Sequence, residues 1–132
     1  MLLLSDVRDW LKTLNTGANN FYIGRLDAKK DKSIGIYPLK VSGPPTVALG
    51  GLDATKTATK SISILLHWNK NAKETEIAAL NLFNKLLAAG SVTIGATKVN
   101  YIKMLVPEPV DVGTDQSNVY ERVIQCELYY ER

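Results

Sequence analysis

The sequence has very few of the residues that build reactive centres. Among its 132 residues there is one cysteine, Cys126, and one histidine, His67. A single cysteine excludes an internal disulfide framework and any metal site that needs several thiolates. A single histidine leaves few ways to build a catalytic centre around imidazole. The chain also lacks any run of about 18 apolar residues, so we expect no membrane-spanning helix.

The composition that remains is typical of a globular protein, with 45% hydrophobic and 22% charged residues. A chain of this length can bury roughly two-thirds of the surface that it exposes when unfolded. We therefore expect one self-sufficient domain over residues 1–132. The apolar start, residues 1–4, is not expected to be a signal peptide, because Asp6, Arg8 and Asp9 interrupt it at once.

Charge is distributed unevenly along the chain. The net charge is +3 and the pI about 9.0. Residues 1–107 hold 14 Lys and Arg against 7 Asp and Glu, whereas residues 108–132 hold 2 against 6. Proteins that bind nucleic acids usually gather basic residues on one face among aromatic residues, and here the lysines are scattered. A chain that is basic at one end and acidic at the other favours head-to-tail pairing with copies of itself.

Hydrophobic periodicity predicts two helices and four to five strands. The expected elements are a helix over 2–15, strands over 21–26 and 33–39, a strand over 60–68, a helix over about 72–89, a short apolar piece over 91–94, and strands over 97–106 and 119–131. Residues 27–32 look like the polar tip of a hairpin, and residues 107–118 like a rigid, acidic turn. The fold class is α+β: an antiparallel or mixed sheet of four to five strands, with two helices packed on one face and a long extended arm or loop.

Each predicted element has a face that we expect to be buried. In the strand over 60–68, the row Ile62, Ile64, Leu66 and Trp68 alternates with the row that ends in His67. In the strand over 119–131 the predicted inward row comprises Tyr120, Ile124, Cys126, Leu128 and Tyr130. Asn71 and Glu74 have the spacing of a capping box, which predicts the start of the second helix. The predicted buried stripe of that helix comprises Ile77, Leu80, Phe83, Leu86 and Leu87, with Ala78, Ala79 and Ala88 allowing close approach. Apolar residues also fall on outer rows of the sheet, where a monomer gains nothing by exposing them. They include Leu65, Ile102, Val123 and Tyr129.

Residues 41–59 form the least regular stretch. They are rich in Gly, Pro and Thr and have no helical period. Gly50-Gly51 is not followed by the Lys-Ser/Thr of a phosphate-binding loop, which excludes a nucleotide site of that kind. Long irregular segments inside compact domains tend to be functional or mobile. Two interpretations stay open, an extended arm that orders against a partner and an irregular surface loop.

No arrangement of residues predicts catalysis, a metal site or a cofactor. Glu74 and Glu76 lie two apart on a helix and so point in different directions. Asp111 and Asp115 lack the further ligands of a calcium loop. Cys126 lies on an apolar strand row and is expected to be a small buried hydrophobic residue.

The C-terminal third carries a family resemblance. Residues 107–130 resemble the minor capsid or tail-completion proteins of tailed bacteriophages and prophages, in which a Pro-x-Asp-hydrophobic-Gly-x-Asp turn leads into a final strand that ends in paired aromatics. The matching residues are Pro109, Asp111, Val112, Gly113, Asp115, Tyr120, Tyr129 and Tyr130. The sequence departs from the pattern at residues 116–118, where the family often has a glycine. The order of the expected elements fits the family as well.

The resemblance implies a non-enzymatic structural role, that of a tail terminator. Such proteins assemble as a homo-oligomeric ring, usually a hexamer, at the head-proximal end of the tail tube. They stop tail growth and contact tail-tube and head-completion proteins. DNA passes through the ring without sequence-specific binding. The implied location is the head-tail junction of the virion, after assembly in the cytoplasm of the bacterial host. The competing interpretations are a small basic nucleic-acid-binding α+β module and a small enzyme or ligand-binding domain.

A closed ring requires two different patches on each subunit. We expect the tip of the first hairpin, residues 27–32 (the basic loop), of one subunit to lie near the acidic turn, residues 107–118, of the next. Apolar outer-row residues are expected to supply most of the affinity, and charged pairs to set register and association rate. The expected interface residues are Lys29, Lys30, Lys32, Pro44, Pro45, Gly50, Gly51, Asp111, Asp115 and Tyr129.

Overall fold

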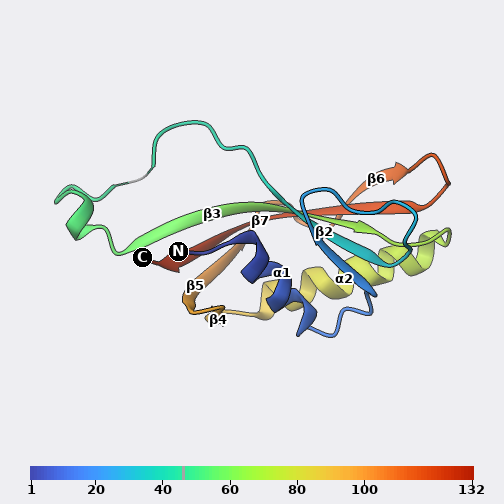
Figure 1. The fold of residues 1–132 in the computed structure, drawn as a ribbon, viewed down its shortest axis with the longest axis horizontal. Coiled ribbons are helices and arrows are strands. Elements are labelled where there is room, and N and C mark those ends of the chain that lie inside the picture. Colours follow the sequence, from blue (N-terminus) through green and yellow to red (C-terminus); the bar gives the residue numbers. More distant parts are fainter. Residues whose placement is uncertain (46) are drawn as a thin grey trace.

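The computed structural model describes residues 1–45 and 47–132, and a ribbon of two long strands runs along its longest axis (Figure 1). The elements in chain order are α1 (Leu4–Lys12), β1 (Asn20–Ile23), β2 (Ser33–Pro38), the 3₁₀ helix η1 (Leu52–Ala54), β3 (Thr57–His67), α2 (Ala72–Ala88), β4 (Val92–Ile94), β5 (Thr97–Met104), β6 (Val110–Thr114) and β7 (Tyr120–Glu131). The predicted α+β class is confirmed.

All seven strands belong to one mixed sheet, with the order β1-β2-β3-β7-β5-β4. The sixth strand, β6, pairs with β7 as well, along the part of β7 that β5 leaves free. The predicted number of four to five strands is therefore too low. The two strands that account for the difference are hidden in the sequence, because β4 is only three residues long and β6 carries Asp111 and Gly113 in the segment predicted as a turn.

The predicted hairpin between the first two strands is wrong. Strands β1 and β2 are parallel, with Asn20 opposite Ser33 and Ile23 opposite Ile36. Gly24, at a φ of 71°, turns the chain out of β1. The loop then passes Gly35, where an added Cβ would lie 3.1 Å from the Leu26 side chain. The missing side chain at Gly35 thus leaves the loop room to return along the sheet to the start of β2.

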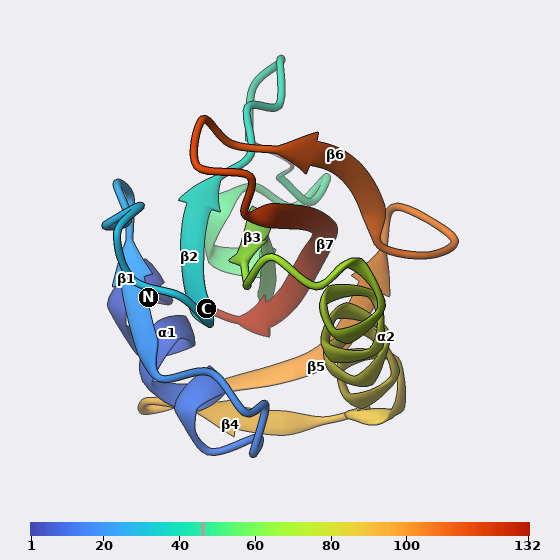
Figure 2. The same cartoon turned by 90° about the vertical axis from the view of Figure 1, so that its right-hand side faces the viewer.

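Both helices lie on the same side of the β3–β7 ribbon (Figure 1), and the sheet curls around them (Figure 2). Helix α1 buries Val7 and Leu11. The shared core also contains alternate residues of the two long strands: Ile62, Ile64 and Leu66 of β3, and Ile124, Cys126 and Leu128 of β7. The predicted inner rows of these strands are confirmed at these positions.

Helix α2 buries only part of the predicted stripe: Phe83 and Leu86 are buried as predicted, and the other buried residues lie on a neighbouring face. Asn71 caps the helix as expected, since its side chain accepts a hydrogen bond of 3.1 Å from the backbone N–H of Glu74. The buried residues are Thr75, Ala78, Ala79, Leu82, Phe83 and Leu86. Ile77 and Leu87, by contrast, are 48% and 61% exposed. Apolar residues surround most of this helix, so two stripes were available, and the one with two alanines packs closer to the sheet.

Two smaller corrections concern α1 and β5. Helix α1 ends at Lys12, short of the predicted residue 15, because Asn15 and Gly17 have positive φ values of 60° and 84°. Ile102 is buried, whereas it was expected on the outer face. A register shift between Val99 and Tyr101 reverses the alternation along β5 and turns Ile102 into the core.

Candidate assembly surface

The most conspicuous surface feature is the long connection between β2 and β3, residues 39–56, which we call the arm. It leaves the end of β2 near the middle of the molecule, runs to the far end of the ribbon and returns into the start of β3 (Figure 1). The predicted irregular stretch, 41–59, is too long at its C-terminal side, because Thr57–His67 is strand β3. Thr46, within that stretch, lies outside the described residues.

The tip of the arm is held by its own hydrogen bonds. The Thr55 hydroxyl accepts a bond of 2.9 Å from the N–H of Ala48 and donates one of 3.0 Å to the carbonyl of Gly51. The Arg132 guanidinium donates to the carbonyls of Leu52 and Thr55 at 3.1 and 3.3 Å. The tip is therefore an ordered turn, and the Arg132 side chain holds it to the end of β7.

Two of the predicted interface residues shape this turn. Gly51 has a φ of 89°, a left-handed conformation that favours glycine. At Gly50 an added Cβ would lie 2.8 Å from the Cβ of Ala54, closer than two such atoms approach in practice. The sequence singled out both glycines as interface residues, and the structure places them where they determine the shape of the tip.

Beneath the arm is a hollow of about 1040 Å³, bounded by the arm, by the start of β3 and by the end of β7. Its lining includes Pro44, Pro45 and Tyr129, so three predicted interface residues meet here. The arm also exposes four large apolar side chains: Val41, Val47, Leu49 and Leu52. Apolar residues over an open hollow are typical of a surface that another chain covers.

Strand β3 has an unpaired edge next to this hollow. Strand β7 pairs with β3 along its whole length, from Thr57 to His67, whereas β2 pairs only with residues 62–67. Leu39 adds one bond of 3.1 Å, from its N–H to the carbonyl of Ser61. Within residues 1–45 and 47–132, no strand pairs with the remaining edge, residues 57–60.

A second unpaired edge belongs to β6. This strand pairs with β7 on one side, and on its other side no strand of the described chain adjoins it. All five of its residues are exposed, and its two valines, Val110 and Val112, are 43% and 49% exposed. In Figure 1, β6 and the tip of the arm lie toward opposite ends of the long axis.

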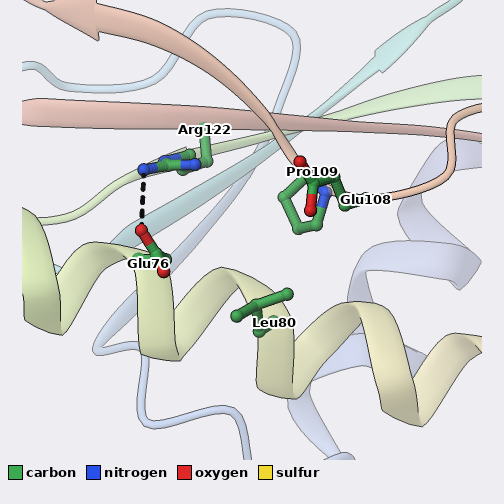
Figure 3. Close-up of a pocket in the computed structure, with 5 residues that line it drawn as sticks. All are labelled: Glu76, Leu80, Glu108, Pro109 and Arg122. Atoms are coloured by element: carbon green, nitrogen blue, oxygen red, sulfur yellow. Dashed lines mark hydrogen bonds and ion pairs between the residues drawn. The ribbon is translucent and has the colours of Figure 1, made fainter.

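A small hollow of about 110 Å³ lies between α2 and the start of β6 (Figure 3). Arg122 lies beside it, 3.5 Å from the Glu76 carboxylate of α2 and 3.8 Å from the Asp111 carboxylate of β6. Leu80 and Pro109 supply its apolar wall. The hollow is too small for an ordinary cofactor. Its residues instead fix β6 relative to the helix.

The basic loop and the acidic turn meet within one subunit. His67 is fully buried and lies between them: its Nε2 is 2.9 Å from the carbonyl of Ala28, and its Nδ1 is 3.0 Å from Glu121 Oε2. Asp115 Oδ2 is 3.7 Å from Nε2. The loop with Lys29, Lys30 and Lys32 thus lies at the same end as Asp115, and the two do not form separate patches on opposite ends. Chain order could not reveal this, because only the sheet topology brings the loop to the end of β3.

Hydrogen bonds stabilise the ionised form of Asp115. Its carboxylate accepts from the backbone N–H of Val119 at 3.0 Å and of Ser117 at 2.8 Å. These bonds, that of Val119 above all, hold the pKa of Asp115 below its ordinary value. His67 adds a weaker attraction in the same direction. Asp115 therefore organises its own turn, which is a structural task.

The remaining reactive groups give no sign of chemistry. Burial raises the pKa of the Cys126 thiol to about 12, so the reactive thiolate is scarce at neutral pH. The described residues contain no group of three His, Cys, Asp or Glu side chains placed to hold a metal ion. In the same part of the chain, no helix combines the length and the apolar character that crossing a bilayer requires.

Comparison with known proteins agrees with the resemblance in the sequence. A protein-family model described as "Bacteriophage tail terminator protein" matches residues 5–132. The match extends well beyond residues 107–130, the segment that carried the resemblance, and includes both helices and the arm. No curated protein sequence matches the chain significantly.

Proposed function

Because the chain belongs to the bacteriophage tail terminator family, we propose that it is a subunit of a homo-oligomeric ring that caps the tail tube at its head-proximal end. The family is one of phage structural proteins, so the chain is a component of the head-tail region. Beyond that, the proposal specifies a hexamer that stops tail growth and presents a surface to head-completion proteins. Assembly takes place in the cytoplasm of the bacterial host, and the ring carries no cofactor.

The observation that carries the proposal is the arm over its open hollow. Apolar side chains of Val41 and Val47 face solvent there together with Pro44 and Pro45, and none contributes to the core of its own subunit. Burial of apolar area stabilises association by about 25 cal/mol per Å² before the cost of ordering is subtracted. In our proposal this surface includes the four predicted residues of the arm (Pro44, Pro45, Gly50 and Gly51) and Tyr129. Of the remaining predicted residues, Lys29, Lys30, Lys32 and Asp115 lie at the other end of the molecule.

The proposal predicts a concentration-dependent ring. Analytical ultracentrifugation of the full chain should show a monomer that converts to a single larger species, and electron microscopy should show a ring with a central opening. A phage that lacks the gene should produce tails of abnormal length, and the chain should restore normal ones. A chain that stays monomeric at every concentration, both alone and with tail tubes, would contradict the proposal.

A nucleic-acid-binding module is the second candidate. One observation favours it: the exposed Tyr101 ring lies 5.9 Å from that of Tyr129, centroid to centroid, on the strand that also carries Lys98 and Lys103. Aromatic rings beside lysines can stack on the bases of a single strand. Titration with single-stranded DNA at low and high salt tests this directly. Tight binding that falls steeply with salt and disappears in Tyr101→Ala would favour the module over the terminator.

A further inference from the structure

The backbone of β3 presents hydrogen-bonding groups to the hollow. In an antiparallel sheet the N–H and C=O of successive residues point to alternate neighbours. The Lys56 carbonyl accepts from the N–H of Arg132, on the β7 side, and the Ser61 carbonyl accepts from Leu39, on the β2 side. The backbone groups of Thr57 and Thr59 therefore point away from β7, to the side where β2 has ended. These groups form a template for one more strand.

The unpaired edges of β3 and β6 are opposite margins of the same sheet. Strand β7 lies between them, since it pairs with β3 on one side and with β6 on the other. A neighbour can therefore bring its β6 to the open edge of β3 with the same face of the sheet outward. Its own β3 edge is then free to receive a third subunit. A repeating contact of this kind is heterologous and gives a ring when its rotation closes, whereas pairing of like edges stops at a dimer.

The side chains of the two edges are complementary. Val110 lies opposite Val123 on the outer row, and Asp111 lies opposite Arg122 on the inner row, next to α2. On β3 the outer row holds Thr57 and Thr59, and the inner row holds Lys60. A register shift between Asp111 and Gly113 interrupts the alternation of β6 at Val112, so the outer row is assigned at Val110. If the rows continue across the contact, Val110 enters the hollow beneath the apolar arm. Asp111 then lies on the same face as Lys60, so charges of opposite sign meet.

We propose that β6 of one subunit adds as a strand to the open edge of β3, residues 57–60, in the next subunit, beneath the arm of that subunit. The partner is a second copy of this chain, and the inference rests on the ring of the proposed function. Main-chain hydrogen bonds give this contact its direction, and Val110 and the arm give it affinity. The arm then acts as a clasp over the added strand.

Cysteine cross-linking tests which edges meet. Thr57→Cys and Val110→Cys, both on the outer row, are made as separate variants, and Cys126 stays silent because it is buried. We expect an oxidised equimolar mixture to give a covalent heterodimer, and the double variant to give a ladder of covalent oligomers. Each single variant alone should stay mainly monomeric on a denaturing gel. Dimers from Thr57→Cys alone would show that like edges pair, and this would overturn the proposal.

Proline substitution tests the hydrogen bonds themselves. Thr59→Pro removes an N–H that β7 does not use, so the fold should persist, and ring formation should fall at least tenfold. The matched control is Thr93→Pro in β4, where Thr93 is exposed and lies opposite Lys98 of β5. Ile94 and Thr97 close the two-residue turn with their hydrogen bonds, so the N–H of Thr93 points away from β5. The control should form rings as the unmodified chain does.

The outcomes separate this inference from the proposed function. Rings that form normally in folded Thr59→Pro, together with no cross-link in the mixture of Thr57→Cys and Val110→Cys, would overturn the strand contact and leave the ring in place. A full chain that never forms a ring would remove both. If Thr59→Pro proves unfolded by circular dichroism, the cross-linking result decides alone.

Discussion

The two halves of β3 differ in the number of their paired edges. Residues 62–67 lie between β2 and β7, and their inner row enters the core at Ile62, Ile64 and Leu66. Residues 57–60 have β7 on one side and an open hollow on the other. Substitutions in the first half should therefore change the free energy of unfolding of the subunit. Substitutions in the second half should change the free energy of association.

The largest effect on folding is expected from Ile64→Ala. Ile64 is fully buried at the centre of the sheet, so the change removes apolar contacts and leaves a cavity. We expect a loss of about 2–5 kcal/mol in the free energy of unfolding, measured by urea denaturation. Ile64→Val, as a graded control, should lose about 0.5–1.5 kcal/mol. A stable Ile64→Ala would mean that the paired half of β3 is not part of the folding core.

The second test removes the arm and leaves both halves of β3. A linker of six Gly and Ser residues can replace residues 41–55, since its extended length of about 20 Å covers the open stretch of strand. The monomer should keep its circular dichroism spectrum, because none of the described residues of the arm belongs to the core, and ring formation should be lost. The matched control is the double variant Leu49→Ser/Leu52→Ser, which keeps the arm's length while removing two of its apolar side chains. A deletion that unfolds the chain would show that the arm stabilises the subunit itself.

A smaller effect is expected for Asp115→Asn, at the end of the molecule where β3 is fully paired. The pKa of Asp115 is lower in the folded protein than its ordinary value of 3.8. The ionised group therefore stabilises the fold above pH 3.8, and this stability is lost as the pH falls toward the folded-state pKa. We expect the unmodified chain to lose melting temperature in that acid range, and Asp115→Asn to lose less. Equal slopes in both chains would show that the turn does not depend on the charge.

The smallest effect is expected from reversing the charges of the basic loop. The triple variant Lys29→Glu/Lys30→Glu/Lys32→Glu should slow ring formation at low salt, because exposed charges mainly set association rates. At high salt the difference should vanish by screening. Light-scattering kinetics at two salt concentrations measure it. A triple variant that forms rings at the unmodified rate at low salt would show that the basic loop takes no part in assembly.

Local pattern was enough for much of the fold. The alternation over 60–68 identified the inner row of β3, and Asn71 marked the start of α2. The predictions that failed concern residues for which the local pattern is compatible with either a buried or an exposed position. Helix α2 has apolar residues on several faces, so packing against the sheet decides which are buried. Ile102 depends on an irregularity in the pairing of β5 with β7, which no local period encodes.

The candidate surface was predictable in composition and not in position. The Gly- and Pro-rich character of the arm pointed to Pro44, Pro45, Gly50 and Gly51, and the structure brings the two prolines to the hollow with Tyr129. The strand β6 was missed, although Val110 and Val112 alternate with Asp111 and Gly113. That alternation was a usable signal, and the neighbouring prolines masked it. The meeting of the basic loop with Asp115 depends on the parallel β1–β2 pairing, which long-range geometry alone determines.

The position of β7 in the sheet has a consequence for the order of synthesis. Strand β7 joins β3, β5 and β6, and it follows all three in the chain. While the ribosome is still making the earlier segments, these strands have no central partner, and most contacts of the sheet are distant in sequence and slow to form. The arm tip likewise receives its bonds from Arg132, directly after β7. A subunit therefore cannot complete its sheet or fasten its arm tip until residues 120–132 have been made.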